Sequence, residues 1–430
     1  MARLPGETPL ATVLSLTHDG QGVANVAGRR TLIAGALPGE IVIFRYLRRH
    51  RQGDEGVAIE IVESSPDRVE PRCPYTERCG GCRLQHLAHD AQLRHHQAYL
   101  ASCLDPGPHR WLAPLTRPPW GYRRKARLGV KYVTKRDVLL VGFRERASPY
   151  VTEIDHCPVL HPSIGERILV LRQVLSQLSI RDKIPQVEIA AGDVQTRLVI
   201  RNMAEPNGED IDHLRGFARD HGLTVALQPG GLDTIAPLEP ADPPPLRYEL
   251  PDYRVAITFR PTDFTQVNGD INRAMVNQAL ALLEPQTGGA VLDLYCGLGN
   301  FTLPLARRGG VVTGIEGEAG LVARARDNAQ ANGLTAEFIS QDLSRGLPAD
   351  LPGTFPLALL DPPRSGALEV LTGLVAKGVQ RLVYVSCNPA TLGRDVAALK
   401  HHGYQLCAAG IVDMFPHTGH VESMALLERS

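Results

Sequence analysis

Residues 292–306, "LDLYCGLGNFTLPLA", decide the fold of the C-terminal half of this chain. An apolar strand runs into a Gly-x-Gly turn, and a helical pattern begins directly after the turn. Glycine allows the backbone to turn tightly and to approach a ligand closely, as in the ligand-binding loops of α/β proteins. The third glycine of the dinucleotide fingerprint is missing, and many nucleotide-binding folds use such a loop. By itself the motif therefore indicates a ligand site without identifying the ligand.

Short apolar runs alternate with helical patterns from about residue 259 to the end of the chain. Besides residues 290–295, further strands are expected at residues 311–316, 336–340, 356–361 and 381–387. Helical patterns such as residues 318–333 lie between them. This rhythm predicts an α/β fold with a Rossmann-like, doubly wound parallel sheet.

Four of these expected strands end at or next to a reactive side chain. Glu316, Asp342, Asp361 and Cys387 end or directly follow the second, third, fourth and fifth strands. Each acid alone is equally well explained as a helix N-cap. Because ligands of parallel sheets bind outside the carboxyl ends of the strands, we expect the four side chains to share one site. A carboxylate that can hold ribose hydroxyls, without phosphate-binding features, favours S-adenosylmethionine over a dinucleotide.

The N-terminal segment has a different pattern. Between residues 8 and 63, five short strand candidates are separated by turn signals such as "HDGQG" (18–22). Five short strands in so little sequence predict a small closed barrel. We therefore expect three domains: a β-barrel at 1–65, a central α+β domain at 66–258 and the Rossmann-like domain at 259–430.

Composition sets outer bounds on the class of protein. A chain of 430 residues with 43% hydrophobic and 21% charged residues is typical of a globular protein with several domains. The longest Pro-rich stretch is residues 237–251. No run of eighteen apolar residues occurs, and residues 1–10 lack the apolar core of a signal peptide. We therefore expect a cytoplasmic, monomeric protein with no membrane partner.

A formal net charge of zero argues against a uniformly basic surface, but local basic stretches remain. Residues 117–136 contain eight Lys or Arg, no acid, and three interleaved aromatic residues. A smaller basic stretch is "RYLRRHR" at 45–51. Solvated strand faces would explain the charges, whereas aromatic rings among cations favour RNA binding, because rings stack on bases.

Three cysteines, Cys73, Cys79 and Cys82, lie within ten residues, and Cys157 offers a fourth. Clustered cysteines in an intracellular chain are more often metal ligands than disulfides. Their spacing does not distinguish zinc from iron–sulfur. It does depart from the usual C-x2-C zinc pattern, and four thiolates suit a [4Fe–4S] cluster.

Taken together, four motifs of the C-terminal half resemble the uracil-C5 RNA methyltransferase family. They are "DLYCGLGNFTLPLA", "DPPRSG", "VSCNPATLGRD" and "DMFPHTGHVESMALL", and they occur in the family's order. The N-terminal barrel resembles a TRAM domain, and "CPYTERCGGC" resembles the iron–sulfur loop of part of the family. That combination is most similar to bacterial members that methylate 23S rRNA at the uridine conventionally numbered 1939. The resemblance implies S-adenosylmethionine as methyl donor, 23S ribosomal RNA as partner and a [4Fe–4S] cluster on the four cysteines.

The resemblance also implies roles for individual residues. Cys387 would add to C6 of uracil and so make C5 nucleophilic, and Glu422 would remove the C5 proton. Tyr295 stands where we expect Phe, which keeps an aromatic ring. The methyl donor would be lined by six residues: Gln266, Tyr295, Asn300, Glu316, Asp342 and Asp361.

Other interpretations remain open from the sequence. The same chemistry could act on tRNA or on another 23S rRNA uridine. A non-catalytic RNA-binding assembly factor and an iron–sulfur oxidoreductase are alternatives of other classes. Intact catalytic motifs argue against the first, and the missing third glycine argues against the second. His417 and His420 beside Glu422 offer an alternative metal site, whereas Cys103, Cys296 and Cys407 are expected to be structural.

Overall fold

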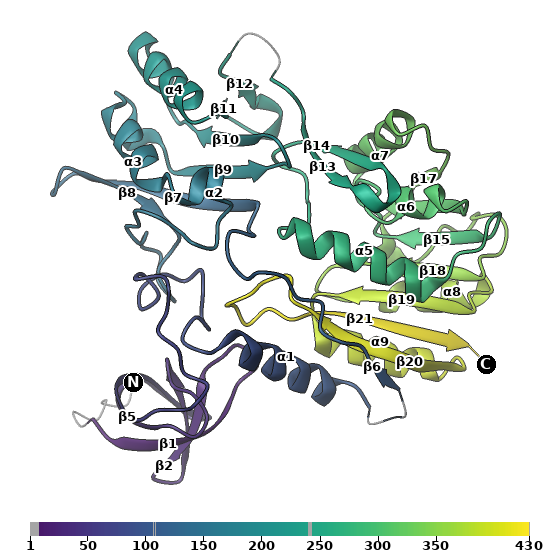
Figure 1. The fold of residues 1–430 in the computed structure, drawn as a ribbon, viewed down its shortest axis with the longest axis horizontal. Coiled ribbons are helices and arrows are strands. Elements are labelled where there is room, and N and C mark those ends of the chain that lie inside the picture. The colour runs from purple at the N-terminus through teal and green to yellow at the C-terminus, as the bar shows by residue number, and fades with distance from the viewer. Residues whose placement is uncertain (1–7, 106, 108, 240–242, 430) are drawn as a thin grey trace. The chain divides into compact units, whose positions relative to one another are not determined.

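The computed structural model describes residues 8–105, 107, 109–239 and 243–429 (Figure 1). Residues 1–7 of the expected barrel segment and 240–242 of the Pro-rich stretch lie outside this description. The chain forms two compact units: unit 1 comprises residues 1–99 and 415–420, and unit 2 comprises residues 100–414 and 421–430. The domain boundaries expected from the sequence stay a prediction. None of the helices in the described chain combines the length and apolarity that a membrane crossing requires.

Unit 1 begins with a closed five-stranded barrel in the order β1-β2-β3-β5-β4, which confirms the expected barrel. Alternate residues of its strands point inward, and Val13, Ile33 and Phe44 are buried in its core. The strands are β1 (Leu10–Leu16), β2 (Gly22–Val26), β3 (Arg29–Ala34), β4 (Ile41–His50) and β5 (Gly53–Glu63).

The segment after the barrel is fixed to it by one buried carboxylate. Glu40 is fully buried and accepts hydrogen bonds from Nε (2.5 Å) and Nη2 (2.8 Å) of Arg68. The backbone N–H groups of Leu37 and Ser65 donate to the same carboxylate. Helix α1 (His89–Cys103) follows, and its Ala91 packs in an apolar cluster with Leu37. The boundary between the two units falls inside this helix.

Residues 415–420 belong to unit 1, although the residues directly before and after them belong to unit 2. Inside unit 1, the Gln92 side chain accepts from His417 N (2.8 Å) and donates to the carbonyls of Leu84 (3.0 Å) and Leu87 (2.8 Å). The carbonyl of His417 accepts from the N–H groups of Arg83 and Leu84 at 2.8 and 3.0 Å. His417 has a left-handed backbone with φ of 67°. We call this arrangement the Gln92–His417 lock.

Unit 2 contains a six-stranded sheet in the order β12-β11-β10-β9-β7-β8 (Figure 1). Helix α3 (Ile168–Gln177) packs against β8, and α4 (Gly208–Asp220) packs against β11. The strands are β7 (Lys125–Val133), β8 (Val138–Gly142), β9 (Gln186–Ala191), β10 (Thr196–Arg201), β11 (Leu223–Gln228) and β12 (Ala236–Pro237). Along β7, Leu128 and Val130 are buried while Arg127 and Lys131 are exposed, as strand alternation requires.

The second large sheet of unit 2 has eight strands in the order β17-β16-β15-β18-β19-β21-β20-β6. The first five are parallel, and β21 is antiparallel to β19. The chain moves outward from β15 to β17 and then crosses back to β18, so strand order reverses between β15 and β18. The strands are β6 (Arg110–Trp111), β15 (Ala290–Leu294), β16 (Val311–Glu316), β17 (Glu337–Ser340), β18 (Leu357–Leu360), β19 (Arg381–Ser386), β20 (Tyr404–Val412) and β21 (Glu422–Arg429).

This sheet confirms the expected α/β, Rossmann-like fold. Its inner strands are buried along nearly their whole length, which explains their uninterrupted apolar sequences. Helix α5 packs against β18, β19 and β21, α7 against β16 and β17, and α9 against β20. The helices are α5 (Gly269–Leu283), α6 (Thr302–Arg307), α7 (Ala319–Ala331), α8 (Leu368–Ala376) and α9 (Pro389–Lys400).

A short hairpin, β13 (Leu246–Leu250) and β14 (Val255–Phe259), precedes α5. Two asparagines near the end of α7 bind the backbone of β14. Asn332 accepts from Ala256 N (2.8 Å) and donates to Ala256 O (2.7 Å), while Asn328 accepts from Thr258 N (2.9 Å) and donates to Thr258 O (3.1 Å). These side chains reproduce the donor and acceptor pattern of a neighbouring strand.

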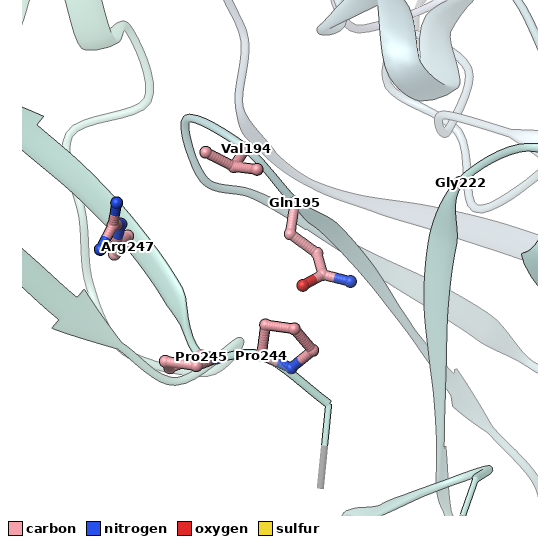
Figure 2. Close-up of a pocket in the computed structure, with 6 residues that line it drawn as sticks. All are labelled: Val194, Gln195, Gly222, Pro244, Pro245 and Arg247. Atoms are coloured by element: carbon pink, nitrogen blue, oxygen red, sulfur yellow. The ribbon is translucent and has the colours of Figure 1, made fainter. Parts of the chain in front are cut away.

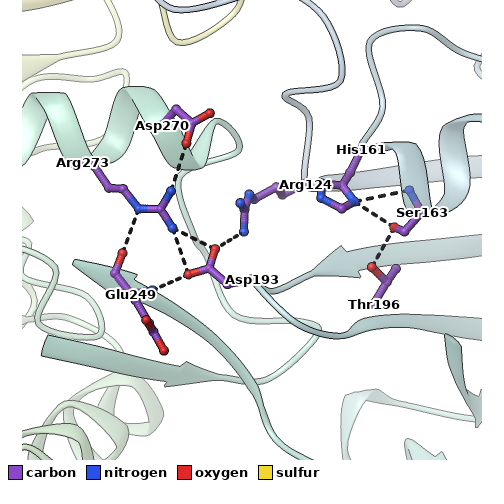
Figure 3. Close-up of polar contacts among 8 residues, drawn as sticks. All are labelled: Arg124, His161, Ser163, Asp193, Thr196, Glu249, Asp270 and Arg273. Atoms are coloured by element: carbon purple, nitrogen blue, oxygen red, sulfur yellow. Dashed lines mark hydrogen bonds and ion pairs between the residues drawn. The ribbon is translucent and has the colours of Figure 1, made fainter. Parts of the chain in front are cut away.

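A second polar junction centres on Asp193, in the turn between β9 and β10 (Figure 3). Its carboxylate accepts from Arg124 (2.5 Å), from Arg273 of α5 (2.9 Å) and from the N–H of Glu249 (2.7 Å). The neighbouring Lys125 side chain donates to the carbonyl of Asp263. Arg124 and Lys125 of the basic stretch therefore bind other residues of unit 2.

Candidate functional site

The expected site residues gather at one edge of the eight-stranded sheet. Glu316 is the last residue of β16, and Tyr295, Asp361 and Cys387 directly follow β15, β18 and β19. Glu422 opens β21, which runs the other way, so it meets the same edge. This edge includes the point of strand reversal, where ligands of such sheets bind.

The pairing of β19 with β21 sets Glu422 beside Cys387. The register ends with Ser386 opposite Ser423, and one further step brings residue 387 opposite residue 422. The hydroxyl of Ser423 donates to the carbonyl of Ser386 at 3.2 Å, which supports that register. Glu422 is buried and Cys387 is half-buried. A thiol and a carboxyl group therefore share one end of the sheet.

The turn that carries Cys387 is fixed on both sides. Asn388 is the N-cap of α9, and its side chain accepts from Ala390 N at 3.1 Å. The Ser386 hydroxyl accepts from Asn388 N at 3.2 Å. Pro389 opens the helix, where its fixed φ is favourable and no N–H is needed. The thiol is therefore held by a capped turn between strand and helix.

Gln266 reaches this edge from the segment before α5. Its side-chain amide donates to Asp361 at 3.2 Å. The adjacent Val267 carbonyl accepts from Arg124 N at 2.8 Å, and Arg123 pairs with Asn268, the N-cap of α5. Arg123 and Arg124, within the basic stretch, thus form a short antiparallel backbone pair with Val267 and Asn268.

The glycine loop folds around Glu316. Tyr295 has φ of 61°, an uncommon value for a residue with a side chain, and such backbones cluster at functional sites. The carboxylate of Glu316 accepts from Gly297 N at 3.1 Å and from Glu318 N at 3.0 Å. The carboxylate of Glu316 therefore joins the glycine loop to the end of β16.

Two other expected residues have partners that the sequence did not suggest. Asn300 accepts from the Tyr248 hydroxyl and from Asn272, both at 2.9 Å. Asp342 is exposed and accepts from the N–H (3.0 Å) and hydroxyl (2.7 Å) of Ser344, so it caps a short helical turn. These two hydrogen bonds lower the pKa of Asp342. The N-cap explanation therefore holds for Asp342, although its position at the strand-end edge is as expected.

Burial dominates the electrostatics at the thiol. Burial raises the pKa of Cys387 to about 11, and Glu422 and Asp361 add to the rise while Arg364 opposes it. Burial also raises the pKa of Glu422 and of Asp361, because a buried carboxyl group is more stable in its neutral form. The isolated protein therefore holds the thiol protonated at neutral pH.

Sequence reasoning missed two charged residues here. Asp293 is buried inside β15, accepts from the Thr302 hydroxyl at 2.5 Å, and has its pKa raised by burial to about 7. An acid inside the apolar run "AVLDLY" was the available signal. Arg364, in the quoted motif "DPPRSG", is the cation whose charge acts on both Cys387 and Glu422.

The four cysteines expected to hold a cluster are divided between the two units. Cys73 and Cys79 are buried and Cys82 is half-buried in unit 1, and Cys157 is half-buried in unit 2. The N–H of Gly81 points to the sulfur of Cys79 at 3.4 Å. Within the described residues, no group of three or more His, Cys, Asp or Glu side chains is arranged to hold a metal ion. The cluster therefore stays a prediction.

A hollow elsewhere in unit 2 shares no residue with the strand-end edge (Figure 2). Among the described residues that line it, one has a titratable side chain, Arg247. The lining consists of Val194, Gln195, Gly222, Pro244, Pro245 and Arg247. The groups that can perform chemistry are thus at the strand ends and not in this hollow.

Comparison with known proteins agrees with the motifs. Residues 247–341 and 354–430 match the family described as tRNA (Uracil-5-)-methyltransferase. The chain is 51% identical over 436 residues to the 23S rRNA (uracil(1939)-C(5))-methyltransferase RlmD of Alkalilimnicola ehrlichii, covering 99% of this chain and 98% of the relative. The protein of the same name from Methylococcus capsulatus is 48% identical over 434 residues, covering 99% and 98%.

A solved structure resembles nearly the whole chain. It is that of Pyrococcus abyssi tRNA (uracil-54, C5)-methyltransferase in complex with S-adenosyl-L-homocysteine, with 25% identity and a TM-score of 0.76. The match covers 97% of this chain and 100% of that chain. Full-length identity to the curated relatives confirms the resemblance, and the chain belongs to the uracil-C5 RNA methyltransferase family.

Proposed function

We propose that this protein transfers a methyl group from S-adenosylmethionine to C5 of a uridine in 23S rRNA, at the position named 1939 in its relatives. The observation that carries the chemistry is the β19–β21 register: its last pair is Ser386 with Ser423, so Cys387 and Glu422 are the next residues at that end of the sheet. Identity of 51% over nearly the full length favours this substrate over tRNA, since the tRNA-named structure is 25% identical.

In the proposed reaction, Cys387 releases its proton to solvent, the resulting thiolate forms a bond with C6, and the ring electrons move toward C5 and the 4-carbonyl oxygen. C5 then attacks the methyl group of the sulfonium donor, which leaves as S-adenosylhomocysteine. Glu422 accepts the C5 proton, and the electrons of that C–H bond restore the double bond as the thiolate departs. This role requires Glu422 in its ionised form, and its raised pKa makes that carboxylate a stronger base than an ordinary one.

Six residues are proposed to hold the methyl donor. Glu316, oriented by Gly297 N, would accept hydrogen bonds from the ribose hydroxyls. Asp361 and Gln266, which are hydrogen bonded to each other, would contact the donor near the reacting methyl group. The other three proposed contacts are Tyr295, Asn300 and Asp342.

Two basic surfaces are proposed to bind RNA phosphates, one on each unit. On unit 2, the exposed Arg127 and Lys131 of β7 continue into the exposed turn residues Lys135 and Arg136. On unit 1, exposed cations occupy the second half of β4 and the residue after it, within residues 45–51. Phosphate binding by such side chains makes affinity strongly salt-dependent.

We propose that Cys73, Cys79, Cys82 and Cys157 hold a [4Fe–4S] cluster. Three thiols in one loop, two of them buried, and the N–H of Gly81 directed at a sulfur fit such a group. Methyl transfer moves no net electrons, so a bound cluster would have a structural role. It would cross-link the segments that carry the four cysteines. We further infer a cytoplasmic, monomeric enzyme.

The test is methylation of 23S rRNA from a deletion strain by wild-type protein and three variants. Cys387→Ala should abolish 5-methyluridine formation while leaving donor binding nearly intact. Glu422→Gln should accumulate a denaturation-resistant protein–RNA adduct, because the C5 proton is lost slowly. Cys407→Ala, which removes a half-buried thiol outside the site, should match wild type. RNA attached to any residue other than Cys387 would overturn the mechanism, and donor binding without methylation of any RNA would favour a non-catalytic RNA-binding protein.

A further inference from the structure

Asp395 is a fully buried carboxylate in α9, eight residues after Cys387. One oxygen accepts from the hydroxyl of Tyr384 and from the N–H of Ala367, both at 2.7 Å. The other accepts from Nε (2.8 Å) and Nη2 (2.7 Å) of Arg394. Asp395 therefore joins β19, which leads to Cys387, to the segment that follows β18.

That segment, residues 361–367, is bound along its backbone by the start of α9. The carbonyl of Arg364 accepts from the side chains of Asn388 (3.2 Å) and Thr391 (3.3 Å). The next carbonyl, that of Ser365, accepts from Arg394 Nη2 at 2.8 Å. With Ala367 bound to Asp395, three nearby backbone groups of the segment are fixed to the Cys387 turn and its helix.

Gly366 permits this close contact. It has φ of 83°, and a Cβ atom built on it would lie 2.5 Å from the carboxylate of Asp395. Any side chain at this position would both strain the backbone and displace the segment from the carboxylate. The segment therefore rests directly on Asp395.

Residues 361–367 include Arg364. Its side chain is exposed, and its charge acts on the Cys387 thiol. The groups whose charge acts on Cys387 are Glu422 on β21, Asp361 after β18, and Arg364, whose carbonyl is bonded to Asn388, the residue next to Cys387. The two acids disfavour the thiolate, and Arg364 is the cation that favours it. The distance of Arg364 from the sulfur depends on where the backbone at residue 364 is held.

We propose that Asp395 is a positioning residue for methyl transfer, which holds residues 361–367 against β19 and α9 so that Arg364 stays beside the Cys387 turn, where its charge favours the thiolate. Tyr384 and Gly366 serve the same arrangement, one by donating to the carboxylate and the other by leaving room for it. The proposal rests on the proposed function for the role of Cys387, but the positioning itself is measurable without RNA.

The experiment measures the rate of Cys387 alkylation by iodoacetamide between pH 7 and 9 in the full-length protein, by mass spectrometry of the Cys387 peptide. This range lies below the midpoint, where the rate rises about tenfold per pH unit and any displacement of the midpoint changes the rate directly. Asp395→Asn, Tyr384→Phe and Gly366→Ala should each move the alkylation midpoint to higher pH. Where the midpoint lies one pH unit higher than in wild type, alkylation below the midpoint should be about tenfold slower. Loss of the Asp395 charge by itself would move the midpoint the other way, because removing an anion favours the thiolate.

Asp210→Asn is the matched control, because Asp210 is a buried carboxylate that accepts from Ser179 N (2.7 Å) and its hydroxyl (2.6 Å), in contact with neither β19 nor α9. It should lower thermal stability and leave the alkylation profile unchanged. If Asp395→Asn does not fold, Tyr384→Phe, which alters no charge, decides the question.

Folded Tyr384→Phe protein that binds S-adenosylmethionine and keeps the wild-type alkylation profile would overturn the proposal. A change in midpoint equal to that of Asp210→Asn would also overturn it. Failure of the proposed function looks different, because the altered alkylation midpoints would persist while no RNA adduct formed on Cys387.

Discussion

Replacement of Gln92 by leucine should open the Gln92–His417 lock of unit 1. The N–H of His417 and the carbonyl of Leu87 would lose their partner, while the carbonyl of Leu84 would still accept from Leu87 N. Each buried group left unpaired costs about 1–3 kcal/mol, and burial of a leucine side chain in place of an amide offsets about 1–2 kcal/mol. The two unpaired groups together cost about 2–6 kcal/mol, so after this offset we expect a net loss of up to about 5 kcal/mol, centred near 2.5 kcal/mol, in the local free energy of unfolding.

Hydrogen exchange of peptides covering residues 83–99 and 415–420 measures this loss, because a protein with two units need not unfold in one step. Exchange should accelerate by about 60-fold for a loss of about 2.5 kcal/mol, since about 1.4 kcal/mol corresponds to a factor of ten. Gln97→Leu is the control on the same helix: its side-chain amide atoms are buried and have no hydrogen-bond partner within the described residues. Equal exchange in wild type and Gln92→Leu, or equal acceleration by both variants, would refute the energetic reasoning.

Three further predictions concern RNA, pH and iron. Lys131→Ala with Lys135→Ala should weaken RNA binding and flatten its salt dependence in filter-binding titrations, because both side chains are exposed. Arg124→Ala should mainly lower the melting temperature, because Arg124 is paired with Asp193. The reverse pattern would contradict the surface assignment. Burial raises the pKa of Asp293 from 3.8 to about 7, so its favourable contribution is full below pH 3.8 and is lost as pH rises through 7. The melting temperature of Asp293→Asn relative to wild type should therefore climb across that window, and a flat difference would argue against the raised pKa. Anaerobically purified protein should contain about four irons and Cys82→Ser should lose them, whereas stoichiometric zinc would exclude the cluster.

The strand ends at the site were predictable because local sequence defines them. Four of the five expected strands are apolar runs that end at or next to a glycine, an acid or Asn388-Pro389, and a buried parallel sheet requires such runs. Their common edge then follows from the direction of parallel strands. The alignment of Glu422 with Cys387 depends on the β19–β21 register, which local patterns do not encode and which the sequence supplied only through family resemblance.

Contacts between distant residues could not be predicted. The basic stretch gives no sign that Arg124 and Lys125 are engaged internally, because their partners Asp193 and Asp263 lie 69 and 138 positions away. Residues 415–420 likewise resemble a loop of the Rossmann-like domain, yet His417 is bound within unit 1. In both cases burial and pairing were decided by tertiary packing.

The asparagine pair on α7 has a consequence for solubility. An exposed strand edge offers a row of unpaired N–H and C=O groups, to which a strand of another molecule can add. At β14, Asn328 and Asn332 already use the groups of Thr258 and Ala256 on the side away from β13. A helix thus closes the edge of a two-stranded hairpin without adding a third strand, and an incoming chain would have to displace four hydrogen bonds before it could extend the sheet there.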